Sequence, residues 1–88
     1  MPKQTLVVHN KSGLHARPAA LFVKTARGFA NTTIQISKDG LTHDAKSILG
    51  VLTLAISRGT SVTIQTEGDE AEAALATLVE AIESGLGE

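Results

Sequence analysis

His15 is the residue whose type and place in the sequence point most directly to chemistry. It lies in the segment Gly13–Pro18, where a polar loop runs into a predicted helix. The first N–H groups of a helix have no partner within it and carry partial positive charge, so an anion is favoured there. The same charge disfavours imidazolium and leaves a neutral ring nitrogen able to attack phosphorus. His15 is therefore a candidate phosphoryl acceptor.

Arg17 and the backbone beside it supply what a phosphoryl group needs. The guanidinium can clamp phosphate oxygens through charge-assisted hydrogen bonds. Pro18 fits the first turn, where its missing N–H costs little, and this leaves the N–H groups of Ala16 and Arg17 as free donors. A second interpretation stays open on these residues alone: His15 only begins a helix, and Arg17 is a solvated side chain.

Ser47 and the apolar segment after it form a second candidate site. Ser47 is predicted to be the N-cap of a short helix from Ile48 to about Ala55. Apolar residues cover nearly all of this helix, more than a small domain can bury, and exposed apolar patches usually bind partners. A phosphate on the N-cap would lie at the positive helix end and change the surface that partners meet. The alternative is a serine that only caps a fully buried helix.

The elements that position these residues follow from hydrophobic periodicity. Alternation predicts strands at 5–9, 33–37, 41–43 and 61–65, with a hairpin at Asp39-Gly40. Helical spacing predicts a helix from His15 to Gly28, the short helix, and a last helix that a capping box of Asp69 and Glu72 opens and Gly85 ends. The order β-α-β-β-α-β-α predicts an α+β fold. We expect a two-layer open-faced sandwich, with a four-stranded antiparallel sheet and three helices on one face.

Size and composition limit the function. The 88 residues make one domain, 1–88, with one core and little room for a deep catalytic pocket. The chain has no cysteine, and His9 and His43 lack ligand spacing, so we expect no metal and no cofactor. A net charge of −1 and only two aromatic residues argue against nucleic acid.

Targeting signals are not visible in the sequence. Neither a signal peptide nor an apolar run of about 18 residues is present, so we expect a cytoplasmic protein without membrane insertion. The C-terminal residues 83–88 are expected to be frayed and solvated.

Two motifs resemble those of HPr, the histidine-containing phosphocarrier of the bacterial phosphoenolpyruvate:sugar phosphotransferase system. Residues 13–19 read GLHARPA, similar to its active-site signature, and residues 46–52 read KSILGVL, similar to the signature around its regulatory serine. The element order and residues 59–79 agree as well, so the resemblance covers essentially the whole chain. One departure is a segment between Phe29 and Gly40 that is one residue longer than the family pattern. A bulge or a longer hairpin loop would absorb it.

The resemblance implies a definite role for each candidate residue. Phospho-enzyme I would phosphorylate His15 on Nδ1 with the help of Arg17, and sugar-specific A-type components would then take the phosphoryl group. An ATP-dependent HPr kinase/phosphorylase would phosphorylate Ser47 and so report carbon supply to a transcriptional repressor. The implied docking residues beside His15 are Ala20, Ile48, Leu49 and Leu52. The protein would be a monomeric carrier rather than an enzyme.

Two other functions remain as alternatives. One is an HPr-like regulatory module that docks on a kinase or repressor without serving sugar transport, although such a module need not keep the nucleophile His15. The other is a ferredoxin-like metal or RNA binder with a related element order. The absence of cysteine, of a basic excess and of surface aromatics argues against this second alternative.

Overall fold

Alternating polar and apolar residues form one antiparallel sheet, as the sequence predicts. The structure is a computed structural model that describes residues 2–88. Its strands are Lys3–Val7 (β1), Thr32–Lys38 (β2), Leu41–Asp44 (β3) and Ser61–Gly68 (β4). They lie in the order β1-β4-β2-β3, and each neighbouring pair is antiparallel. The first and last strands of the chain are therefore paired, with β4 inside the sheet.

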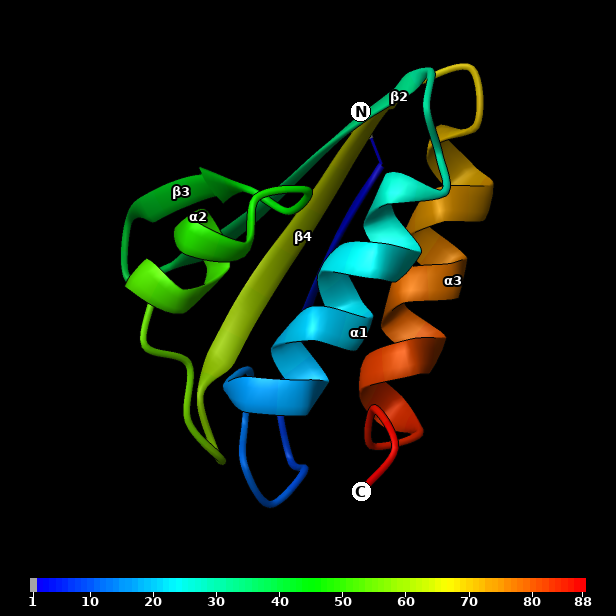
Figure 1. The fold of residues 1–88 in the computed structure, drawn as a ribbon. Helices are drawn as coiled ribbons and strands as arrows, with labels where there is room; N and C mark the ends of the chain where they lie inside the picture. Colours follow the sequence, from blue (N-terminus) through cyan, green and yellow to red (C-terminus); the bar gives the residue numbers. More distant parts are fainter. Residues whose placement is uncertain (1) are drawn as a thin grey trace.

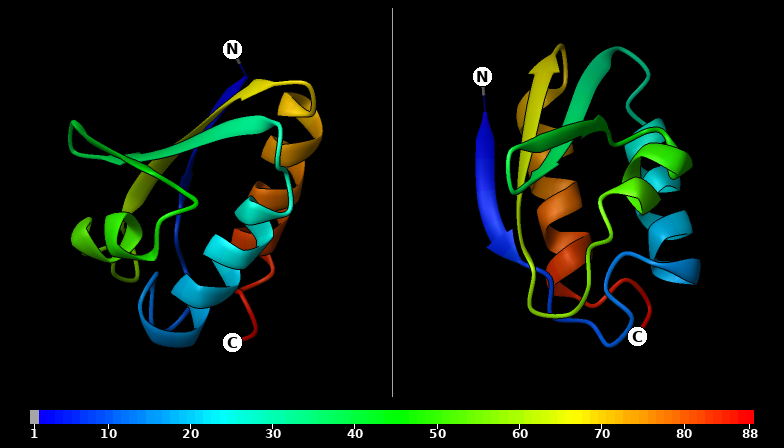
Figure 2. Two further views of the ribbon diagram at one scale, coloured as in Figure 1. Left: turned by 45° about the horizontal axis from the view of Figure 1, so that its top comes forward. Right: turned by 90° about the vertical axis from the view of Figure 1, so that its left-hand side faces the viewer.

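Helices cover one face of this sheet (Figures 1 and 2). They are Ala16–Arg27 (α1), Ile48–Thr53 (α2) and Ala71–Glu83 (α3). Ile34, Ile36, Val62 and Ile64 point inward from the central strands and are at most 1% exposed, whereas their strand neighbours facing the other way are exposed or half-buried. The predicted α+β open-faced sandwich is confirmed, with one apolar and one solvated face.

The buried faces of α1 and α3 are the ones that helical spacing predicts. They consist of Ala19, Phe22, Val23 and Ala26 on α1 and of Ala74, Leu78, Val79 and Ile82 on α3. These side chains join the inner face of the sheet in one core. Because a fully buried large apolar side chain contributes about 1.5–3 kcal/mol relative to exposure, the core holds α1 firmly in place and with it the helix start that carries His15.

The hairpin between β2 and β3 forms at the predicted residues. Asp39 and Gly40 have φ of 50° and 84°, the positive pair that a two-residue type I′ turn requires. The pairing of β2 with β4 runs without interruption from Thr32 to Ser37. The expectation of a bulge or longer hairpin loop is therefore wrong, because β2 pairs without interruption and its hairpin has a two-residue turn.

Two element ends differ from the sequence prediction. β1 covers residues 3–7 rather than 5–9, because the backbone of Val8 bonds to the turn before β4 instead of continuing the ladder. α2 ends at Thr53 rather than near Ala55, whose φ of 52° is incompatible with a right-handed helix.

The predicted capping box at the start of α3 is wrong. The N-cap is Glu70, and its side chain makes no capping hydrogen bond. Two buried threonines of the sheet fix this helix start instead. Thr32 Oγ1 accepts from the Glu70 N–H at 3.1 Å, and Thr66 Oγ1 donates to the Ala71 carbonyl at 2.6 Å.

The expectation of a frayed end at residues 83–88 is also wrong, although Glu83, Ser84, Gly87 and Glu88 are exposed as expected. Gly85 and Leu86 are buried, and the Glu88 carboxylate accepts hydrogen bonds from Asn10 and Ser12. This end of the chain is packed against the loop that leads to His15.

Candidate functional site

His15 stands at the N-cap of α1, with firmly held backbone on both sides. It is extended, with φ −126° and ψ 162°, and its half-buried side chain makes no capping hydrogen bond. Leu14 before it is completely buried and donates its N–H to the Ile56 carbonyl at 2.9 Å, and Pro18 after it is buried as well. The core therefore fixes the backbone while the imidazole is left without a capping role.

Gly13 is required by the fold itself. Its φ is 61°, and a Cβ added there would overlap the carbonyl oxygen of Ile56. Gly13 therefore lets the His15 loop pass directly against residues 56–57.

Ala16, the first residue of α1, has an unusual backbone conformation. Its φ is 50°, in the left-handed region that residues with a Cβ avoid at a cost of about 1–2 kcal/mol. Strained residues of this kind concentrate at functional sites, where the surrounding structure holds them. Here the strain lies directly next to the candidate phosphoryl acceptor.

The hydrogen-bond donors predicted around His15 are free. Among residues 2–88, no acceptor is bonded to the backbone N–H of Ala16 or Arg17. The exposed Arg17 guanidinium likewise has no hydrogen-bond or acidic partner in the described part of the chain. Two amides and one permanent cation within two residues of His15 are thus unpaired among the described residues. This arrangement can bind and neutralise an anion on the ring.

Ser47 is the N-cap of α2, as predicted. It is half-buried, and its Oγ accepts from the Gly50 N–H at 3.0 Å. The three α2 residues expected to be exposed are exposed: Ile48 by 36%, Leu49 by 75% and Leu52 by 39%. The other large apolar residues of this segment, Val51, Leu54 and Ile56, are buried.

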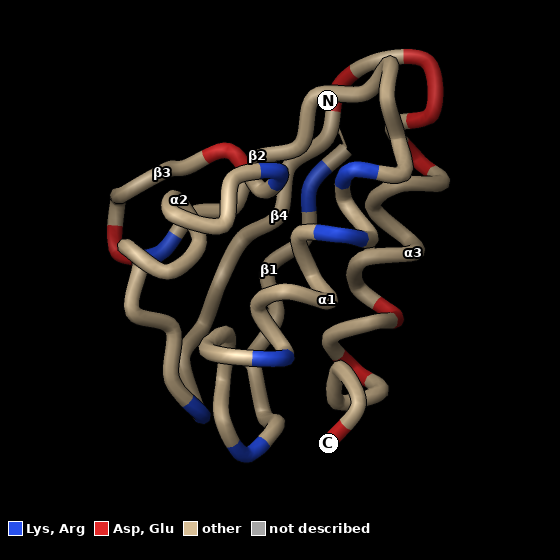
Figure 3. The backbone as a smooth tube through the Cα atoms, viewed as in Figure 1, with Lys and Arg blue, Asp and Glu red and all other residues tan. Residues whose placement is uncertain are grey.

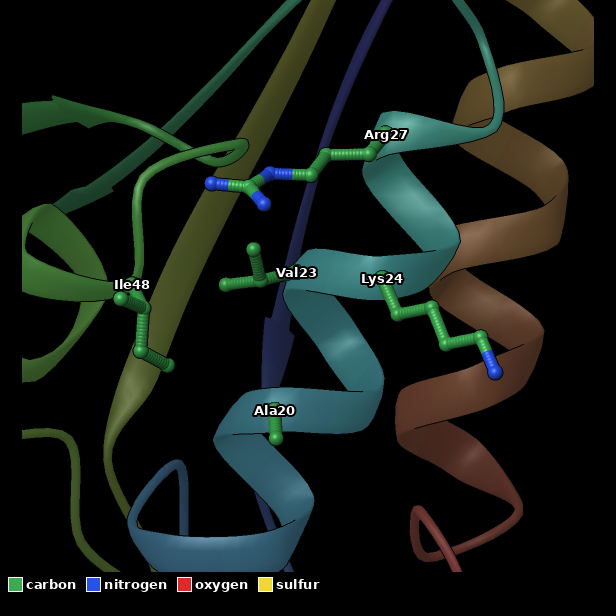
Figure 4. A pocket seen from close by; sticks show the side chains of 5 residues that line it. All are labelled: Ala20, Val23, Lys24, Arg27 and Ile48. Atoms are coloured by element: carbon green, nitrogen blue, oxygen red, sulfur yellow. The ribbon is translucent and has the colours of Figure 1, made fainter.

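A groove of about 270 Å³ lies between α1 and α2. Its lining consists of Ala20, Val23, Lys24 and Arg27 from α1 and Ile48 from α2. Figure 4 shows Val23 and Ile48 facing each other, Arg27 reaching toward the segment before α2, and Lys24 turned away from it. The structure therefore brings Ala20 and Ile48 together, whereas Leu49 and Leu52 do not line the groove.

Long-range contacts that the sequence analysis missed hold α2 against α1. Arg27 Nε donates to the Lys46 carbonyl at 2.8 Å. The Lys46 ammonium donates to the carbonyls of Phe29 and Thr32 at 2.7 and 2.6 Å. No local sequence signal indicates these contacts, because each donor reaches a backbone oxygen at least 14 residues away.

Charge is distributed unevenly between the two long helices (Figure 3). α1 carries Arg17, Lys24 and Arg27 and no acid, whereas α3 carries Glu72, Glu80 and Glu83 and no Lys or Arg. Figure 3 shows the same division as blue segments on α1 and red segments along α3. Although the net charge of the chain is only −1, the helix whose N-cap is His15 is therefore cationic.

His9 and His43 gain no ligand role from the fold. His9 Nε2 lies 3.1 Å from the carbonyl oxygen of Glu83. Within residues 2–88, no three His, Asp or Glu side chains are placed to share a metal ion. The described helices are also too short or too polar for any of them to span a membrane.

Known proteins resemble this chain over nearly its full length. The family model described as the PTS HPr component phosphorylation site matches residues 2–84. The HPr-like protein Crh of Halalkalibacterium halodurans is 45% identical over 83 residues, covering 94% of this chain and 98% of that protein. Crh of Bacillus subtilis, described as a catabolite repression HPr, is 45% identical over 78 residues, which cover 89% of this chain and 91% of that protein.

A solved HPr from Thermoanaerobacter tengcongensis is the structural counterpart. It superposes with a TM-score of 0.97 at 48% identity and covers 100% of this chain and 98% of its own. An HPr dimer from the same organism superposes with a TM-score of 0.80. These matches span both helix starts described above.

Proposed function

The chain belongs to the HPr family, and on this premise we propose that it is a phosphocarrier of the phosphoenolpyruvate:sugar phosphotransferase system. It takes a phosphoryl group from phospho-enzyme I on Nδ1 of His15 and passes it to sugar-specific A-type components. The observation that carries the proposal is the open start of α1, where an imidazole, two unpaired amides and Arg17 meet. The protein is a carrier in the cytoplasm and not an enzyme.

In this proposal His15 forms the bond to phosphorus, and Arg17 and the two amides stabilise the charge on the phosphoryl oxygens. The bond from His15 Nδ1 to phosphorus forms as the bond between phosphorus and the enzyme I donor breaks, and the second transfer reverses these roles. Charge on the phosphoryl oxygens is offset by the Arg17 guanidinium and by the N–H groups of Ala16 and Arg17. Because phosphoryl transfer depends mainly on positioning and electrostatics, this small site needs no deep pocket.

The exposed apolar residues of α2 provide the docking face for both partners. Ile48, Leu49 and Leu52 are exposed, and the groove places Ile48 opposite Ala20, one turn of α1 beyond Arg17. A relay protein must release each partner quickly, and small transient interfaces suit that requirement. We propose that the chain acts here as a monomer, although an HPr relative has been solved as a dimer.

Ser47 is the proposed control point. A phosphate from ATP, added by an HPr kinase/phosphorylase, would place a charge of about −2 beside the docking residues Ile48 and Leu49. Enzyme I would then dock less well, and a transcriptional repressor would meet a changed surface. The similarity to Crh, a catabolite repression HPr in Bacillus subtilis, supports this regulatory role.

Labelling with phosphoenolpyruvate and enzyme I tests the proposal. We expect one acid-labile phosphate on the wild-type chain and none on His15→Ala, while the matched control His9→Ala is labelled normally. Undiminished labelling of His15→Ala would refute the site.

The second candidate function is a regulatory module without a role in sugar transport, with which the similarity to the HPr-like protein Crh is compatible. A chain that enzyme I leaves unlabelled, but that the ATP-dependent kinase labels with an acid-stable phosphate lost in Ser47→Ala, would establish it. The retained pair of His15 and Arg17 is the reason to place the phosphocarrier first.

A further inference from the structure

The side chain of Glu88 is bonded to the loop that leads to His15. Oε1 accepts from the Ser12 backbone N–H at 2.8 Å, and Oε2 accepts from the Ser12 hydroxyl at 2.7 Å. Oε1 also accepts from Asn10 Nδ2 at 3.1 Å. The Ser12 hydroxyl above all, and then the other two donors, hold the pKa of Glu88 below the ordinary glutamate value. A carboxylate is therefore present at neutral pH.

Asn10 transmits this contact to Gly13, two residues before His15. Its Nδ2 also donates to the Gly13 carbonyl at 2.8 Å, while its own carbonyl accepts from the Gly13 N–H at 3.1 Å. Asn10 is only 4% exposed, and its Oδ1 is buried without a partner among the described residues. Two acceptors on one amide nitrogen fix the orientation of the amide, because a flipped amide would oppose oxygen to oxygen.

The segment that carries Glu88 is itself anchored. Leu86 is 5% exposed, its N–H donates to the Ala81 carbonyl at 3.1 Å, and the Glu88 N–H donates to Gly85 at 3.0 Å. The carboxylate is thus held at the end of a packed turn after α3. Loop 10–13 is bonded within itself by Asn10 and Gly13, and Glu88 closes its outer side.

We propose that Glu88 is a positioning residue for phosphoryl transfer at His15. Its carboxylate holds loop 10–13 through Ser12 and Asn10, and the fixed loop sets the place and direction of the imidazole at the start of α1. Glu88 does not contact the phosphoryl group, and it acts only through these two residues. The inference deepens the proposed phosphocarrier function and rests on it.

A positioning role predicts a particular kinetic pattern. An exposed carboxylate adds no apolar burial, so removing its charge leaves the core and the thermal midpoint nearly unchanged. Ala20 and Ile48 lie on another part of the surface, so docking of enzyme I also stays intact. A less well placed imidazole, in contrast, reaches the reactive geometry less often. We therefore expect kcat for phosphorylation by enzyme I to fall while KM is unchanged.

Glu88→Gln and Glu83→Gln form a matched pair for this test, since both remove one exposed acid near the end of the chain. With phosphoenolpyruvate and enzyme I, we expect kcat to fall roughly three- to tenfold in Glu88→Gln and to keep its wild-type value in Glu83→Gln. Glu88→Asp, which keeps the carboxylate, should recover most of the rate. The double variant of Glu88→Gln with Ser12→Ala should lose little more than either single variant.

Amide and imidazole NMR signals separate this inference from the proposed function. In Glu88→Gln the Ser12 amide and the His15 ring nitrogens should both shift. A wild-type kcat in a variant whose Ser12 amide has shifted would overturn the positioning role. If enzyme I fails to label even the wild-type chain, the phosphocarrier function fails instead. Unmoved His15 ring signals in Glu88→Gln would then still refute the positioning of His15 by Glu88.

Discussion

The starts of α1 and α2 are alike in backbone and opposite in capping. Both N-caps are extended, with φ and ψ of −126° and 162° at His15 and −107° and 117° at Ser47. Ser47 bonds the Gly50 N–H with its own side chain, whereas His15 caps nothing and precedes a strained Ala16. A capped start stabilises its helix, whereas an open one keeps its donors for a ligand. The difference explains how one small domain can use the start of α2 to stabilise a helix and the start of α1 to bind a phosphoryl group.

The start of α3 shows that a missing side-chain cap is not sufficient for such a site. The N-cap Glu70 makes no capping bond either, but Thr32 satisfies its N–H and acidic residues surround it. Negative charge already present there repels a phosphate. What distinguishes α1 is the combination of free donors, a cation and a nucleophile.

Among the changes considered at the two helix starts, replacing Arg17 by Ala should slow phosphoryl transfer the most. The variant loses a charge-assisted clamp worth about 1.5–3 kcal/mol, so transfer from enzyme I should slow roughly 10- to 100-fold. The free energy of unfolding should not change, because the Arg17 guanidinium has no partner within the described residues. Single-turnover labelling measures the rate, and Arg58→Ala is the charge-matched control. If both variants slow equally, the effect comes from the loss of one positive charge and not from a contact of Arg17 with the phosphoryl group.

Removing the cap of α2 tests the other half of the comparison. Ser47→Ala should lower the free energy of unfolding by about 1 kcal/mol, while Ser47→Thr, which keeps the hydroxyl, should lose only a fraction of that. His15→Ala should leave stability almost unchanged, because His15 forms no cap. Urea denaturation gives all three values. A loss in His15→Ala as large as that in Ser47→Ala would break the distinction between the two starts.

Relieving the backbone strain at Ala16 should stabilise the fold and slow phosphoryl transfer to His15. Ala16→Gly should raise the free energy of unfolding by about 0.5–1 kcal/mol, because glycine adopts positive φ without penalty. Transfer should slow, since the relaxed backbone no longer fixes the amides beside His15. Ala73→Gly in α3 is the control and should instead destabilise by about 1 kcal/mol. A destabilised Ala16→Gly would show that Ala16 carries no strain.

Acid should release the contact between the Glu88 carboxylate and Ser12. Hydrogen bonds lower the pKa of Glu88 in the folded state. The contact therefore contributes its full share to the stability of the fold at pH values above the ordinary glutamate pKa. Its contribution is lost as pH falls through the lowered value. A pH titration should therefore move the Ser12 amide only at pH values below the ordinary glutamate pKa. A Ser12 amide that titrates near neutral pH would identify another group as the cause.

Local patterns in the sequence predict most of this fold because they act over few residues. The Asp39-Gly40 pair sets its own turn, and the spacing on α1 and α3 identifies their buried faces. The site motifs were visible for the same reason, since a helix start is a feature of four or five consecutive residues. Counting more apolar residues than the helix could bury predicted only that some are exposed, and the resemblance to the HPr family identified them as Ile48, Leu49 and Leu52.

What the sequence did not reveal depends on partners far away in the chain. The capping box failed because the hydroxyl of Thr32, 38 residues distant, bonds the Glu70 N–H. The end of the chain looked frayed because its partner Ser12 lies 76 residues away. Contacts of this kind follow only once the topology is known.

Amide NMR of the chain before and after phosphorylation by phosphoenolpyruvate and enzyme I tests the central claim most directly. If the open start of α1 receives the phosphoryl group, the largest shifts will occur at the N–H groups of Ala16 and Arg17, while the capped Gly50 N–H will move little. Largest shifts at Gly50, or a phosphorylated chain whose Ala16 and Arg17 amides do not move, would contradict it.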